Sequence, residues 1–205
     1  IRPTPFKHTG IFPEQRSNWD WLKKVIVSAK RDISVLNLFA YTGGATLAAL
    51  AAGANVCHVD GSKKAIAWAR QNTEASHLSD KPVRWILDDA ITFAKRELRR
   101  GKCYDGIILD PPSFGHGPKG ESWLIENDFL SLIDVCGQLL SKNPAFILIN
   151  GYAAGYSALA YKNCIQAIIP KAHGNIEAGE LLIPDRAGRL LSCGIYSRWS
   201  PLKLD

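Results

Sequence analysis

Short runs of β-branched and apolar residues recur along the chain, and longer segments with apolar residues at every third or fourth position separate them. A short continuous apolar run is typical of a buried strand, and the three-to-four spacing is typical of a helix with one buried side. The predicted strands are residues 33–39, 55–60, 83–87, 104–110, 145–150, 176–183 and 189–196. The predicted helices are residues 17–29, 44–52, 62–76, 89–100 and 127–140.

This alternation predicts an α/β fold of the Rossmann-like type, because strands that alternate with helices form βαβ units and a parallel sheet covered on both faces. Only residues 184–188 separate the last two strands, and their spacing and composition suit a hairpin. We therefore expect a mostly parallel seven-stranded sheet with one antiparallel strand. Residues 1–30 should form a leading segment whose helix packs beside the ligand pocket, and residues 31–205 should form the main domain.

Ligands of such sheets bind beyond the carboxyl ends of the strands. The first strand leads into a glycine-containing turn at residues 41–44, which either approaches a ligand or simply turns the chain. The second strand ends at Asp60, whose carboxylate can accept both hydroxyl groups of a ribose, as in binders of NAD and of S-adenosylmethionine alike. The third leads to Asp89, which can accept an adenine amine, cap the following helix, or do both.

The fourth predicted strand delivers Asp110 and two prolines to the same edge of the sheet. Prolines fix the backbone and lack an N–H donor, so the turn is stiff. The Asp110 carboxylate and the Pro111 carbonyl can both accept N–H bonds from one amino group and orient its nitrogen toward a methyl donor, so that catalysis comes from positioning. Phe114 can stack on an acceptor base. A rigid strand exit without chemistry is the alternative, but hydride transfer has no use for this arrangement.

Four segments carry a resemblance to a known family: FPEQ at residues 12–15, NLFAYTGG at 37–44, VDGSKKA at 59–65 and DPPSFG at 110–115. Together they resemble the ribosomal large-subunit RNA methyltransferases, which implies the class I methyltransferase fold, S-adenosylmethionine as cofactor and ribosomal RNA as substrate. The resemblance implies a cofactor site of Gln15, Phe39, Tyr41, Thr42, Gly43, Asp60, Ser62 and Asp89. It implies that Asp110 holds the acceptor, in the reaction turn where the residues themselves also suggest Pro111 and Phe114.

The chain departs from the family at two points. Its relatives carry an upstream RNA-binding domain, and none is visible in this sequence, whose lack of an initial methionine suggests that an upstream segment is missing. The fifth strand ends at Asn150 and lacks the cysteine nucleophile that methylation of a cytosine carbon requires. None of the five cysteines of the chain is placed to attack a base. We therefore expect methylation of a base amino group, most simply that of guanine. The alternatives are methylation of a small-molecule or protein amine, and a non-catalytic domain that binds nucleotide or RNA.

Composition adds limits to this interpretation. At 205 residues, with 46% hydrophobic residues, the chain has the size and apolar content of one globular domain. Its apolar runs are shorter than a membrane span, it has no targeting leader, and its five scattered cysteines lack metal-site spacing, so we expect a cytoplasmic protein without metal. The net charge of +6 fits a polyanionic partner. One basic cluster either contacts RNA or forms a solvated helix face: Lys95, Arg96, Arg99, Arg100 and Lys102.

Four further features have two interpretations each. The glycine-rich residues 115–120, which include His116 and Lys119, either act on the substrate by closing over it or contacting a phosphate, or form a mobile solvated loop. Trp19 and Trp21 favour packing over ligand contact, His58 favours a structural role, and Tyr152 either borders the acceptor or packs in the core.

Overall fold

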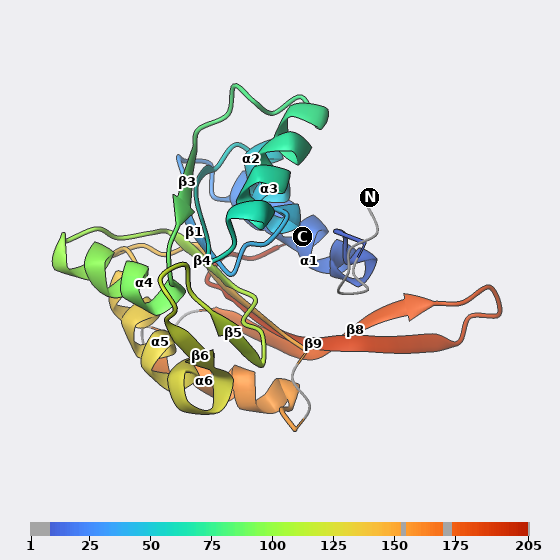
Figure 1. Ribbon diagram of the computed structural model, residues 1–205. Helices are drawn as coiled ribbons and strands as arrows, with labels where there is room; N and C mark the ends of the chain where they lie inside the picture. Colours follow the sequence, from blue (N-terminus) through green and yellow to red (C-terminus); the bar gives the residue numbers. More distant parts are fainter. Residues whose placement is uncertain (1–8, 153–154, 170–173, 205) are drawn as a thin grey trace.

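The computed structural model describes residues 9–152, 155–169 and 174–204, so the first eight residues of the predicted leading segment lie outside it (Figure 1). One seven-stranded sheet has the order β3-β2-β1-β4-β7-β9-β8. Its strands are β1 (Ser34–Leu38), β2 (Asn55–Asp60), β3 (Val83–Leu87), β4 (Gly106–Leu109), β7 (Phe146–Gly151), β8 (Asn175–Pro184) and β9 (Leu190–Ser200). Strand β9 is antiparallel to both of its neighbours, and the other pairs are parallel. The predicted mostly parallel sheet with one antiparallel strand is confirmed.

The helices are α1 (Arg16–Ser28), α2 (Gly44–Ala51), α3 (Lys63–Ala75), α4 (Ala90–Arg99), α5 (Ile125–Leu139) and α6 (Ala158–Ile168). A 3-10 turn, η1 (Pro13–Gln15), precedes α1. The five predicted helices agree with α1 to α5 within two residues at each end. Sequence reasoning missed α6, in which only Tyr161 and Ile165 are buried, because so narrow an apolar stripe has little periodicity.

A small hairpin was also missed. Strands β5 (Phe114–His116) and β6 (Ser122–Leu124) form a separate antiparallel pair that flanks the centre of the predicted glycine-rich loop, residues 115–120. Three residues are too few for an alternating pattern to be recognised in the sequence.

Two hydrophobic clusters cover the two faces of the sheet, as the alternation of side chains along a strand requires. In β1, Val35 packs in the cluster that contains α1 and α2, whereas Leu36 packs in the cluster that contains α4, α5 and α6. Helices α1 to α3 accordingly lie on one side of the sheet and α4 to α6 on the other, and the β8–β9 hairpin extends away from the body (Figure 1). Within the described ranges, no helix combines the length and the apolar character that a membrane crossing needs.

Candidate functional site

A cavity of about 890 Å³ opens where the parallel strands end. Most of the predicted site residues line it, namely Gln15, Phe39, Tyr41, Thr42, Asp60, Ser62, Asp89, Asp110 and Pro111. Gly43 and Phe114 are not among its lining residues. Five separate segments of the sequence thus meet in one pocket, because the carboxyl ends of parallel strands share one edge of the sheet.

The turn after β1 has an unusual backbone. Phe39 and Tyr41 have φ angles of 56° and 48°, in the left-handed region that residues with side chains seldom adopt. Gly43 has φ 89° at the start of α2, and a Cβ there would meet the Ala69 Cβ at 3.2 Å. Gly43 therefore allows the tight turn into α2 without lining the cavity itself. The turn places the N-terminus of α2 at the pocket.

The end of β2 holds Asp60 in a fixed orientation. Its Oδ2 accepts the backbone N–H of Tyr41 and its Oδ1 accepts that of Ser62, both at 2.8 Å. Burial raises the pKa of Asp60, although the two backbone hydrogen bonds counteract it. Each carboxylate oxygen has a second lone pair, so Asp60 can still accept a hydrogen bond from a ligand bound in the pocket.

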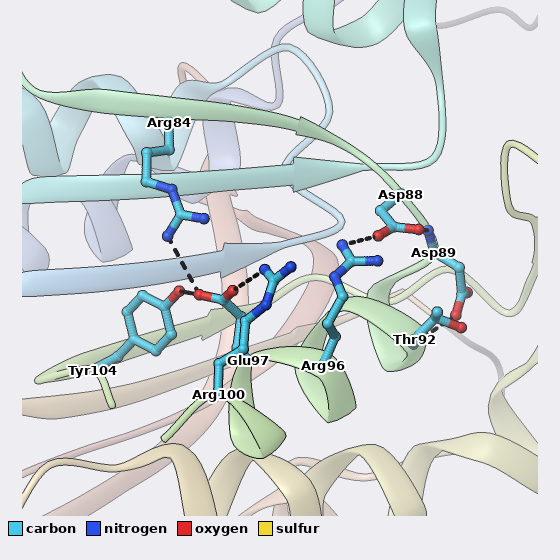
Figure 2. Close-up of polar contacts among 8 residues, drawn as sticks. All are labelled: Arg84, Asp88, Asp89, Thr92, Arg96, Glu97, Arg100 and Tyr104. Carbon is cyan, nitrogen blue, oxygen red and sulfur yellow. Dashed lines mark hydrogen bonds and ion pairs between the residues drawn. The ribbon is translucent and has the colours of Figure 1, made fainter. Parts of the chain in front are cut away.

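The turn after β3 carries two adjacent carboxylates (Figure 2). Asp89 caps α4, because its Oδ1 accepts the backbone N–H of Thr92 at 2.8 Å. Asp88 accepts the Asp89 backbone N–H at 3.0 Å and pairs with Arg96 through its other oxygen. The predicted capping role of Asp89 is therefore present, and its Oδ2 is left to accept from a ligand.

Glu97 binds a second member of the basic cluster, Arg100, together with Arg84 of β3 (Figure 2). It is fully buried and accepts hydrogen bonds from Tyr104 at 2.7 Å, Arg100 at 3.2 Å and Arg84 at 3.3 Å. Burial alone would raise the pKa of Glu97, but these donors outweigh it and the pKa lies below its ordinary value. Arg96 and Arg100 thus pair with carboxylates of the protein itself. The sequence had suggested either RNA contact or a solvated helix face for this cluster, and neither interpretation included such ion pairs.

The reaction turn follows β4. Asp110 lies partly buried at the cavity wall, where burial and then the negative charge of Glu14 raise its pKa to about 7. The Pro112 carbonyl accepts the indole Nε1–H of Trp123 at 2.8 Å, and the Ser113 carbonyl accepts the Ile125 N–H at 3.0 Å. The turn is therefore stiffened by its prolines and also fastened from behind by β6 and the start of α5.

Trp123 is a site residue that sequence reasoning missed. Its side chain is 3% exposed, lines the cavity and packs on Phe39 with ring centroids 4.8 Å apart. One side chain thus contacts both the turn after β1 and the turn after β4. Only the presence of a tryptophan just after the reaction turn could have pointed to this role.

The leading segment contributes to the cavity directly. The Gln15 amide donates to the Tyr152 hydroxyl at 2.8 Å and accepts from the Asn18 amide at 3.0 Å. Asn18 is fully buried and also donates to Asn150 Oδ1 at 2.8 Å. Because Asn150 and Tyr152 line the pocket, this chain of side chains joins the start of the protein to the end of β7.

Three undecided residues are placed clearly. Trp19 packs over Gly44, where a Cβ would meet its ring at 2.8 Å, and it also lines the cavity, so its position is compatible with both packing and ligand contact. Trp21 does pack in the core, against Phe146. His58 is buried with Nδ1 at 2.9 Å from the Thr46 hydroxyl, and burial lowers its pKa to about 3, so its structural role is confirmed.

The hairpin β5–β6 lies against the turns that carry Asp60 and Asp89. A Cβ at Gly61 would meet the His116 carbonyl oxygen at 3.1 Å, and a Cβ at Gly117 would meet the Asp89 Cβ at 3.0 Å. The glycine-rich segment therefore forms one side of the cavity, and its closure over the substrate stays a prediction.

The charge of the cavity tests the fit of the expected cofactor. Among the lining residues within the described ranges, four are aspartates (Asp60, Asp88, Asp89 and Asp110) and none is a lysine or arginine. S-adenosylmethionine brings a sulfonium cation, an ammonium group, a ribose diol and an adenine amine, all of which complement carboxylates. A phosphate-bearing dinucleotide would meet like charge, so the chemistry fits S-adenosylmethionine better. No group of three or more His, Cys, Asp or Glu side chains able to hold a metal ion occurs in the described part of the chain.

Comparison with known proteins agrees with this chemistry. Residues 5–168 match the model of a family described as S-adenosylmethionine-dependent methyltransferase. A solved S-adenosylmethionine-dependent methyltransferase from Agrobacterium tumefaciens is 42% identical with a TM-score of 0.92, over 97% of this chain and 66% of that one.

Two curated relatives are named ribosomal RNA large subunit methyltransferases. One of them, K/L from Shewanella sp. strain MR-4, is 31% identical over 72% of this chain and 20% of its own length. The other, I from Aeromonas salmonicida, is 40% identical over 52% of this chain and 26% of its own length. The chain thus spans about a fifth to a quarter of these relatives.

Proposed function

Because the chain belongs to the family of S-adenosylmethionine-dependent methyltransferases, we propose that it methylates an amino group of a base, most simply guanine, in ribosomal RNA. The Asp110–Pro111 turn carries this proposal, since it brings two hydrogen-bond acceptors together at the wall of the cofactor cavity. The names of the relatives support RNA as the substrate. No cysteine is among the cavity-lining residues of the described chain, which favours nitrogen over carbon as the acceptor. A ribosomal substrate also implies that the protein acts in the cytoplasm.

The cofactor roles follow from the acceptors that the fold leaves available. Asp60 would take the ribose diol with its remaining lone pairs, with Ser62 beside it, and Asp89 would take the adenine amine with Oδ2. The methionine end would lie at the turn after β1, lined by Phe39, Tyr41 and Thr42, with Gly43 shaping that turn. We assign Gln15 to the same end, so that residues 1–30 act as a leading segment that completes the pocket.

When bound, S-adenosylmethionine supplies a methyl group on a positively charged sulfur. Asp110 and the Pro111 carbonyl would accept the two N–H bonds of the target amine and direct its lone pair at that methyl group. The new N–C bond forms as the S–C bond breaks, the sulfur keeps the electron pair, and the nitrogen becomes cationic. Because the pKa of Asp110 is raised to about 7, its carboxylate can then take the departing proton.

Incubation with methyl-labelled S-adenosylmethionine and undermethylated large-subunit ribosomal RNA tests the proposal. We expect label in the RNA, and nucleoside digestion should find it on one base amino group. Label in small amines or proteins but not in RNA would contradict the RNA substrate. Absence of S-adenosylmethionine binding in calorimetry would favour a non-catalytic binding domain.

A further inference from the structure

The hairpin β5–β6 presents a side-chain platform next to the reaction turn, which we define as Phe114, His116, Ser122 and Leu124. The register pairs Phe114 with Leu124 and His116 with Ser122, so these four side chains share one face of the hairpin. All four are exposed, and Phe114 has the highest exposed fraction among the large hydrophobic residues of the described chain, at 76%.

The opposite face of the hairpin lines the cavity, which His116 of the platform also borders. Gly115 pairs with Trp123, and both residues line the pocket, with Trp123 only 3% exposed. Side chains alternate between the faces of a strand, so Phe114 is directed away from the cavity that Asp110 borders. An acceptor base inside the pocket would therefore contact Trp123 and the reaction turn, and the expectation that Phe114 stacks on that same base loses its geometric support.

We propose that this platform binds the base of a nucleotide adjacent to the methylated one, with Phe114 stacking on its face and Leu124 packing at its edge. This inference rests on the proposed RNA substrate. The platform is continuous with the acceptor site, because Phe114 lies four residues after Asp110 on the same stiff turn. An exposed aromatic ring on a small sheet, with an aliphatic neighbour, is the arrangement by which single-stranded bases are bound without sequence preference.

The charges around the platform suit the backbone of the same strand. His116 lies beside Phe114 on the platform, and the exposed Lys119 lies in the turn that joins β5 to β6. Lys119 can approach a phosphate at this end of the hairpin, whereas the cavity itself is lined by carboxylates. Glu121 lies in the same turn and accepts the Lys119 backbone N–H at 2.8 Å, so the turn has no net charge. The continuity of the platform with the acceptor site is therefore what favours RNA over a protein partner.

The test compares Phe114→Ala with the wild type on the shortest oligonucleotide that the wild type methylates. Stacking of one base predicts that the KM for RNA rises about 5- to 150-fold. The kcat and the Kd for S-adenosylmethionine should stay unchanged, because the side chain faces away from the cavity. Leu124→Ala should give a smaller rise in KM. Leu159→Ala, which removes an exposed leucine of α6, should give none and serves as the matched control.

A second measurement identifies the base. Replacing the neighbouring nucleotide on one side of the target by an abasic one should raise the wild-type KM by a similar factor, with little further effect in Phe114→Ala. An unchanged KM in an active Phe114→Ala enzyme would overturn this inference but not the proposed function. The same holds if an abasic nucleotide, placed on either side of the target, raises the KM of Phe114→Ala by the same factor as that of the wild type. A loss in kcat with unchanged KM would instead assign Phe114 to the target base. If the wild type binds S-adenosylmethionine but methylates no RNA, the proposed function fails, and this inference fails with it.

Discussion

Asp110 is a carboxylate whose protonation controls its proposed role. Burial and the charge of Glu14 raise its pKa to about 7, and only the ionised form can accept an N–H bond of the target amine through either oxygen without donating one. We expect kcat/KM for S-adenosylmethionine to rise with pH and to level off above about pH 7. Glu14→Gln keeps the shape of the side chain but removes the negative charge, so it should move the midpoint to lower pH. A pH–rate profile of both proteins measures this, and an unmoved midpoint would contradict the coupling.

The same shift makes a prediction about stability. Because the pKa of Asp110 is higher in the folded state than in the unfolded chain, its contribution to folding is present at acidic pH and lost as pH rises through about 7. Asp110→Asn should therefore stabilise the protein at pH 8 by at least about 1 kcal/mol, the equivalent of one pKa unit, and have little effect at pH 4. Urea unfolding at both pH values measures the difference. Equal effects at the two values would rule out a buried ionised carboxylate here.

Trp123 tests whether the reaction turn needs support from behind. Trp123→Phe removes the indole donor to Pro112 but keeps an aromatic ring against Phe39. Loss of one hydrogen bond of about 0.5–1.5 kcal/mol should lower kcat by about 2- to 13-fold, with little change in the affinity for S-adenosylmethionine. Trp85→Phe, on β3, is the control. Equal kcat values for Trp123→Phe and the wild type would mean that the prolines alone hold the turn.

Single residues could be predicted where the topology alone places them. Asp60, Asp89 and Asp110 follow strand ends, and the order of strands and helices brings those ends together. Trp19 and Trp123 could not be found this way, because each reaches the cavity through a contact with another segment, at Gly44 and at Pro112. Such contacts depend on how helices and hairpins pack, which a local pattern does not encode.

Among the elements, α4 is important because it anchors the turn that carries Asp88 and Asp89. Arg96 pairs with Asp88, which in turn accepts the Asp89 backbone N–H. We expect Arg96→Ala to raise the Kd for S-adenosylmethionine about 5- to 10-fold while leaving kcat at saturation unchanged, because one charge-assisted hydrogen bond is lost. Arg99→Ala, an exposed neighbour on the same helix, should leave the Kd unchanged. Equal Kd values for the two variants in calorimetry would contradict the anchoring role.

Elements with a clear period were predicted well and the others were not. Helices α1 to α5 carry a broad apolar side, whereas the strands of the β5–β6 hairpin are too short to show one. Strand β9 continues to Ser200, four residues beyond its predicted end, because Ser197, Arg198 and Trp199 pair with β7 even though the first two are polar. The charge of Arg198 is compensated by Glu177 on β8, a pairing that only the folded sheet creates.

At the scale of the whole molecule, one buried polar network beside the cavity joins both ends of the described chain. Asn18 connects Gln15 with Asn150 and accepts from Arg198 at 3.2 Å, so α1, β7 and β9 meet in one buried polar network. Thr42 donates to the Gly10 carbonyl at 2.7 Å and holds the leading segment over the turn after β1. The part of the cavity expected to hold the cofactor and the part expected to hold the acceptor are therefore connected through the same elements. Different residues line each part.

This separation makes Asp110→Ala the most direct test of the account. Calorimetry should find the Kd for S-adenosylmethionine within about twofold of the wild type, because the turns after β1, β2 and β3 are unaltered. Single-turnover methyl transfer to the identified RNA should fall at least about 100-fold, because the amine loses its charged acceptor. Methyl transfer at the wild-type rate, in a variant that binds the cofactor normally, would contradict the central role of the Asp110 turn.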